Sequence, residues 1–234
     1  MARVTNGITG EISGKLGGLV FHRRNGKQFV RQRPESFLPG TDPESVDRRS
    51  RFAFSVKLGA AIYSVPELSA IWRKAAPKNK SVFNFIVGNN SNRVTARSIT
   101  ESSVIVPPFD VRSMKKELAV TCIRTSISSG SIDIELTPPG NAANAKEVDG
   151  RPAMLLSVIC LARPVNRSLP AFAFVAAVST LLQIELDTSV VFNISLGGQD
   201  RLTVENYEER KVLFTVAALD DKNNPAYYSA TIVK

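Results

Sequence analysis

The side chains that most often carry enzyme chemistry are scarce in this sequence. Its 234 residues include one histidine, His22, and two cysteines, Cys122 and Cys160. One histidine excludes two-histidine metal sites, and His22 has only Arg23 and Arg24 beside it, with no carboxylate to orient its ring. The cysteines fall in apolar segments, where reduced core thiols are expected. We therefore predict that the protein is not an enzyme and has no catalytic residue, metal site or cofactor.

Two other patterns resemble ligand sites but lack essential parts. Residues 10–18 are glycine-rich like a phosphate-binding loop, but Leu16 follows the Gly-Lys pair where such a loop has Ser or Thr opening a helix. Residues 220–224 carry Asp and Asn oxygens that could bind calcium, but the bidentate glutamate of a calcium loop is missing. Clusters of Asp, Asn and Pro are ordinary turn chemistry, so we predict a turn there.

The net charge of +9 is concentrated in the first part of the chain. Residues 1–97 carry 17 lysines and arginines against 6 acidic residues, a balance of +11, whereas residues 98–234 carry 13 against 15, a balance of −2. This asymmetry favours an anionic partner for the N-terminal part: nucleic acid, a membrane surface or an acidic neighbouring subunit. A solubilising excess with no partner is the alternative.

Residues 1–40 read as a basic, glycine-rich arm. Asn25-Gly26 stands between the alternating runs 19–23 and 28–33, which predicts a β-hairpin. A segment this rich in glycine cannot bury a core of its own, so we expect it to order on a partner surface. The candidate partner-binding residues are the cations and apolar side chains that alternate along it: Lys15, Val20, Phe21, Arg23, Arg24, Lys27, Phe29, Val30, Arg31 and Arg33.

A protein partner fits this arm better than nucleic acid. The aromatic rings of Phe21 and Phe29 would anchor it in a neighbour's groove while the arginines bind carboxylates. The alternative is that the cations follow a phosphate backbone and the rings stack on bases.

Residues 41–97 are predicted to be helical. Asp42-Pro43-Glu44 is a strong helix start, Pro66 begins a second helix that ends before Pro77, and Ser81 caps a third that ends at the polar run 88–92. The expected buried stripe of the first helix consists of apolar residues at helical spacing, Phe52, Val56, Ala60 and Tyr63, broadened by Phe54, Leu58, Ala61 and Ile62.

Residues 98–234 are predicted to be β-structure throughout. The expected strands are 103–106, 118–124, 131–136, 153–162, 171–178, 182–186, 190–196, 212–218 and 227–233. Short strands at this spacing, with no helical pattern between them, favour an antiparallel β-sandwich, Ig-like or jelly-roll-like. The most hydrophobic run, residues 169–184, is interpreted as buried β-structure, too short for a bilayer helix. The predicted fold class is therefore α+β, with three parts: arm 1–40, helical region 41–97 and sandwich 98–234.

The N-terminal pattern Gly10-x-x-Ser13-Gly14-Lys15-x-Gly17-x-x-Val20-Phe21-x-x-x-Asn25-Gly26-Lys27-x-x-Val30-Arg31-x-x-Pro34 resembles the start of a family found in Bacteroidota genomes and their phages. Arg51-Phe52-Ala53 and Phe83-Asn84-x-x-Val87-x-Asn89-Asn90 extend the likeness over roughly residues 7–90. The family carries no established activity, so the resemblance implies no catalytic residue and, at most, a structural role in a virion or phage-like particle.

These patterns together predict a non-enzymatic assembly protein that docks to other structural subunits, as a homo- or hetero-oligomer, through its N-terminal arm. Nucleic-acid binding by the cationic N-terminal part is the alternative. No apolar stretch typical of a secretory signal follows Met1, so we expect cytoplasmic synthesis and a place within a particle, with no membrane span and no small-molecule substrate.

Overall fold

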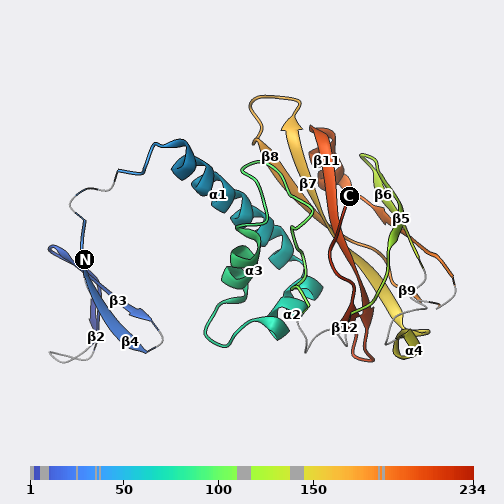
Figure 1. Ribbon diagram of the computed structural model, residues 1–234, viewed down its shortest axis with the longest axis horizontal. Helices are drawn as coiled ribbons and strands as arrows, with labels where there is room; N and C mark the ends of the chain where they lie inside the picture. The colour runs from blue at the N-terminus through green and yellow to red at the C-terminus, as the bar shows by residue number, and fades with distance from the viewer. Residues whose placement is uncertain are drawn as a thin grey trace. The chain divides into compact units, whose positions relative to one another are not determined.

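The chain is mixed α+β with mostly antiparallel sheets (Figure 1). The computed structural model describes residues 3–5, 11–24, 26–34, 36, 38–109, 117–137, 145–183, 185 and 188–234. The chain divides into two compact units, Met1–Val46 and Asp47–Lys234. Each unit is described by itself below.

The first unit contains a four-stranded antiparallel sheet in the order β1-β2-β3-β4. Its strands are β1 (Arg3–Thr5), β2 (Glu11–Leu16), β3 (Leu19–Arg24) and β4 (Lys27–Gln32). Gly17 (φ +56°) and Gly26 (φ +77°) supply the left-handed backbone that the β2–β3 and β3–β4 turns need. The predicted hairpin is therefore formed by β3 and β4, while Asn25 itself lies outside the described residues.

The predicted helix starts are confirmed by their caps. Helix α1 (Pro43–Ser64) begins after Asp42, whose Oδ1 accepts the Ser45 N–H at 2.8 Å. Helix α2 (Pro66–Ala75) has a proline in its first turn and ends before Pro77. Helix α3 (Val82–Asn90) begins after Ser81, whose Oγ accepts the N–H of residue 84 at 3.2 Å.

The buried face of α1 was predicted only in part, whereas α3 ends within the predicted polar run 88–92. The buried stripe of α1 is Phe54, Ser55, Leu58, Gly59 and Ile62, and the prediction included Phe54, Leu58 and Ile62. Phe52 and Tyr63, which were also expected to be buried, are exposed. The buried stripe includes a serine and a glycine, which cannot be identified by looking for large apolar residues at helical spacing. Helix α3 continues to Asn90, because the Asn90 side chain donates to the Ile86 and Val104 carbonyls and accepts the Val104 N–H.

The rest of the second unit contains two antiparallel sheets. The larger has the order β12-β11-β7-β8, with β9 also paired to β7 and β13 to β11. Its strands are β7 (Pro152–Pro164), β8 (Phe172–Val178), β9 (Leu182–Gln183), β11 (Tyr207–Leu219), β12 (Pro225–Tyr228) and β13 (Ile232–Val233). The smaller has the order β10-β6-β5, with β5 (Cys122–Ile127), β6 (Ser131–Leu136) and β10 (Val190–Ser195).

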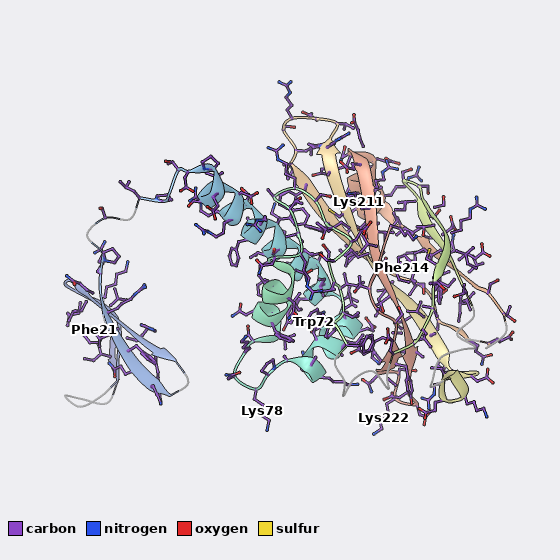
Figure 2. All side chains as sticks on the ribbon, in the orientation of Figure 1. Phe21, Trp72, Lys78, Lys211, Phe214 and Lys222 are labelled. Atoms are coloured by element: carbon purple, nitrogen blue, oxygen red, sulfur yellow. The ribbon has the colours of Figure 1, made fainter. Side chains whose placement is uncertain are left out.

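The long strands β7 and β11 supply two hydrophobic cores, one on each face of the larger sheet. Leu156 and Val158 pack in a cluster with the helices, which includes Trp72. Leu155 and Phe214 pack in a second cluster with the smaller sheet. Figure 2 shows Trp72 among the helices and Phe214 among the strands. Because side chains alternate along a strand, one pair of central strands serves both cores.

Several predicted strands of this region differ from the structure. Residues 103–106 form no strand, because their backbone groups bond to side chains: the Ile105 N–H donates to Thr231 Oγ1 at 3.0 Å. Strand β5 begins at Cys122 rather than at 118. The region also contains two short helices that were not predicted, α4 (Ala145–Val148) and α5 (Gly198–Glu205).

The most hydrophobic run of the chain does not lie in the sheet interior. Strand β8 is the edge of the larger sheet, and only Val175 among its residues is buried. Residues 180–183, further along the run, are all exposed. The expectation that residues 169–184 form buried β-structure was therefore wrong for most of the residues described there.

Candidate protein-docking surface

The sheet of the first unit has two chemically different faces, defined by its strand register. Directly paired residues of antiparallel strands place their side chains on the same face. Leu16, Leu19 and Gln32 share one row across β2, β3 and β4. Two residues further along β3, Phe21 pairs with Val30 on that same face. Leucine, valine and phenylalanine therefore gather on this side, which we name the apolar face: Leu16, Leu19, Phe21 and Val30.

The opposite face is cationic. Lys15 and Arg31 flank Val20 in one row, and two residues further along β3 His22 pairs with Phe29 on the same face. The two rings of that pair stack with centroids 5.4 Å apart and planes 19° apart. Lys15 and Arg31 are both exposed, so the face presents positive charge beside an aromatic pair.

The remaining predicted docking residues lie next to the β3–β4 turn or just after β4. Arg23 pairs with Gln28, in the register of the apolar face. Arg24 pairs with Lys27, in the register of the cationic face, and the side chain of Arg24 is outside the described ones. Arg33 follows β4, and its backbone N–H donates to the Gly18 carbonyl at 2.7 Å.

The predicted set therefore divides between two surfaces. Phe21 and Val30 lie on the apolar face, whereas Val20 and Phe29 lie among the cations. One partner groove cannot take both aromatic rings from the same side. Leu16 and Leu19, which belong to the apolar face, were missing from the predicted site. The Gly17-Gly18 pair between them was the available signal, because a two-residue turn places its flanking residues opposite one another.

Among the residues of the first unit whose side chains are described, none is buried. Leu16, Leu19 and Val30 are each between 42% and 58% exposed. A sheet normally needs a second layer to bury its apolar side, and an isolated small sheet is marginal in water. The apolar face is therefore a surface that gains stability when something covers it.

Cys160 is buried, and two of the glutamates of the second unit have cationic partners. Burial raises the pKa of the Cys160 thiol to about 11, which keeps it neutral and unreactive. Glu205 accepts from Arg201 at 2.9 Å, and Glu209 lies 3.3 Å from Arg163, so these carboxylates have cationic partners. In the described part of the chain, no group of three His, Cys, Asp or Glu side chains is placed to hold a metal ion.

Residues 220–224 form a turn, as predicted. Asp220 Oδ1 accepts the backbone N–H groups of Asn224 and Lys222, each at 2.9 Å, and these bonds, that of Asn224 first, lower the pKa of the Asp220 carboxyl. Asn223 takes the left-handed conformation (φ +59°), which asparagine tolerates better than most residues. The Asp220 carboxylate therefore stabilises the turn in which it lies.

A tyrosine–carboxylate contact fixes the short helix α4. The Tyr227 hydroxyl donates to Glu147, and this hydrogen bond, followed by burial, raises the pKa of Tyr227. The Arg151 guanidinium lies over the Tyr227 ring at 5.7 Å. These contacts join α4 to β12.

Over the residues described, no helix combines the length and the apolar character needed to cross a bilayer. Comparisons with protein families, with curated proteins and with solved structures found no match to this chain.

Proposed function

We propose that this chain is a non-enzymatic assembly protein that docks onto neighbouring subunits through its N-terminal sheet. The observation that carries the proposal is the combination of an exposed apolar face with the absence of any buried residue among those of the first unit whose side chains are described. A unit built in this way completes its core only on another surface.

The apolar face is the docking side in this proposal. It presents leucine, valine and phenylalanine, so covering it removes apolar area from water without burying a row of charges. The cationic face stays toward solvent or toward acidic side chains at the rim of the interface, where arginine–carboxylate pairs orient the contact.

The body that the sheet serves is a β-sandwich in this proposal, Ig-like or jelly-roll-like in type. Its support is the hydrophobic cluster that the six-stranded and three-stranded antiparallel sheets share. The setting we propose is a virion or phage-like particle, in which the N-terminal sheet acts as an arm between subunits. The resemblance over residues 7–90 supports that setting.

The first test places a charge on the apolar face of the full-length chain. Val30→Glu puts a carboxylate where docking would bury a side chain, and Val165→Glu is the matched control at a site of similar exposure in the second unit (52% and 59%). Burying an unpaired charge costs several kcal/mol, so we expect self-association to weaken about 100-fold or more in Val30→Glu. The measurement is light scattering of nuclease-treated protein over a range of concentrations.

The control decides how the result is interpreted. Association lost in Val30→Glu and kept in Val165→Glu supports docking through the apolar face. A wild-type chain that stays monomeric, or the same mass in both variants, contradicts docking between copies of this chain by that face.

Nucleic-acid binding is the second candidate, favoured by the cationic face. Lys15 and Arg31 lie beside Val20, and Phe29 stacks with His22, which is the mixture of charge and aromatic rings that single strands bind. The test is fluorescence anisotropy with a labelled single strand of about 20 nucleotides between about 50 and 200 mM salt. Binding that falls steeply with salt, and falls further in Lys27→Glu than in the control Lys222→Glu, supports it. Absence of binding at the lowest salt excludes it.

A further inference from the structure

The outer edge of the larger sheet in the second unit is an open strand of unusual composition. Strand β8 ends the order β12-β11-β7-β8, and β7 is the one strand that pairs with it among the described residues. Strand β9 continues along the same side of β7. From residue 168 to residue 184 the sequence contains no charged side chain.

Three other edge strands, β12, β4 and β5, carry features that discourage pairing, whereas β10 at the edge of the smaller sheet has no proline, charge or register shift but includes the polar residues Asn193 and Ser195. Strand β12 is four residues long and begins at Pro225, β4 carries Lys27 and Arg31, and β5 has a register shift between Cys122 and Arg124. Strand β8 is seven residues long and has neither proline, charge nor bulge. An edge of this kind pairs readily with another strand, which soluble proteins normally prevent.

The hydrogen bonds to β7 show which backbone groups of β8 face outward. The Ser179 N–H donates to the Leu155 carbonyl at 3.0 Å, and the Ala177 carbonyl accepts from Ser157 Oγ at 2.8 Å, so residues 179 and 177 face β7. Antiparallel strands alternate inward and outward groups residue by residue. The outward N–H and C=O groups therefore belong to the alternate positions, Phe172, Phe174, Ala176 and Val178.

We propose that β8 is a dimerisation edge, at which β8 of a second copy of this chain pairs antiparallel about Val175. In this register all seven residues of each strand are paired, and large side chains meet smaller ones: Phe174 lies opposite Ala176, and Phe172 opposite Val178. Complementary sizes across an antiparallel pair are favourable. Both copies contribute the same strand to the contact, as a two-fold interface requires.

The same register also satisfies the backbone. Residues 172, 174, 176 and 178 all have outward groups, and each is paired with another residue of that set. The two strands would therefore form about eight hydrogen bonds, and the pairs at 175 and at 173 with 177 would be the non-hydrogen-bonded ones. Since β8 has no charged side chain, pairing brings no like charges together within the strand pair.

The first experiment measures the dimer dissociation constant of the full-length chain by sedimentation velocity. Val178→Lys guards the edge with a charge, and Val191→Lys is the matched control on an edge strand of the other sheet, with Val178 38% and Val191 57% exposed. Ala176→Pro is a second variant, which removes an outward N–H and leaves the hydrogen bonds to β7 in place. We expect Val178→Lys and Ala176→Pro to raise the dissociation constant about tenfold or more, and Val191→Lys to leave it unchanged.

The second measurement tests the proposed pairing register of the two β8 strands. Val175→Cys places two thiols at a non-hydrogen-bonded pair across the two-fold axis, where a disulfide can form. Oxidation should cross-link this variant into a dimer on a non-reducing gel, while the wild-type chain, which keeps Cys122 and Cys160, should stay uncross-linked.

All measurements are repeated in the Val30→Glu background, so that docking through the N-terminal sheet and pairing at β8 fail or succeed separately. A dimer weakened by the two β8 variants and cross-linked through position 175 supports the proposal. A chain that is monomeric in both backgrounds, a dimer insensitive to Val178→Lys and Ala176→Pro, or equal weakening by Val191→Lys overturns it.

Discussion

Adding one methyl group to helix α1 should destabilise the second unit, although it improves helix propensity. A Cβ built on Gly59 would lie 2.8 Å from Val87 Cγ2, closer than carbon atoms approach in folded proteins. Both residues are buried, and Val87 is a β-branched residue on α3 whose χ1 angle has little freedom in a helix. Gly59→Ala therefore forces α1 and α3 apart or strains Val87.

The expected magnitude follows from two opposing terms. Replacing glycine by alanine in a helix interior gains about 1 kcal/mol of helix stability. Overpacking of a filled core costs about 1–3 kcal/mol. The clash is with a stiff side chain, so we place the cost in the upper part of that range and expect a net loss of about 1–2 kcal/mol in the free energy of unfolding.

The assay is urea denaturation followed by far-UV circular dichroism, with Gly59→Ala, Val87→Ala and the double variant. Removing the Val87 methyl groups makes room for the new one, so the double variant should be at least about 1 kcal/mol more stable than the sum of the single effects implies. A stabilising Gly59→Ala would refute the reasoning, as would additive effects of the two substitutions.

Two further predictions concern the core of the second unit. Trp72→Phe removes the Nε1–H that donates to the Ile105 carbonyl at 2.7 Å and should cost about 1–3 kcal/mol; since Trp72 is the only tryptophan, circular dichroism rather than fluorescence must measure it. The folded chain holds the Cys160 proton up to about pH 11, whereas the unfolded thiol loses it near pH 9. Between those values the free energy of unfolding should therefore fall by up to about 1.4 kcal/mol per pH unit, and below pH 9 this thiol should have no effect. Cys160→Ala should remove that part of the slope in pH-dependent urea denaturation, and an unchanged slope would contradict a buried neutral thiol.

Local signals predicted the helices and the hairpin well. Asp42 and Ser81 cap their helices through the side-chain oxygens that make these residue types good N-caps, and Gly26 takes the positive φ that a tight turn needs. Such features act over three or four residues, so they can be identified without knowing what packs where.

Features that depend on tertiary context could not be predicted in this way. Helix α5 begins at a glycine pair and buries only Val204, so it has no apolar stripe to identify it. Residues 103–106 are apolar and β-prone, but Asn90 and Thr231 take their backbone hydrogen bonds from distant parts of the chain. An apolar run likewise does not reveal whether its strand lies inside a sheet or at its edge.

Only part of the apolar face was among the predicted docking residues. Alternating cations and apolar residues indicated a segment that forms strands, but the division of its side chains between two faces depends on register, which the turn lengths determine. Leu16 was missed because its neighbours resemble a phosphate-binding loop. Its place on the apolar face follows from its pairing with Leu19 across β2 and β3.

The use of β7 and β11 by both hydrophobic clusters has a consequence for how the chain is made. The helices α1 to α3 leave the ribosome before the strands of the larger sheet, but the cluster that holds them includes Leu213 and Tyr228, which are synthesised later. Until then the apolar stripe of α1 lacks its partners on the larger sheet, and the nascent chain is open to aggregation or chaperone capture. A stop codon before β11 would therefore release helices that are intact in sequence but lack the sheet on which they pack.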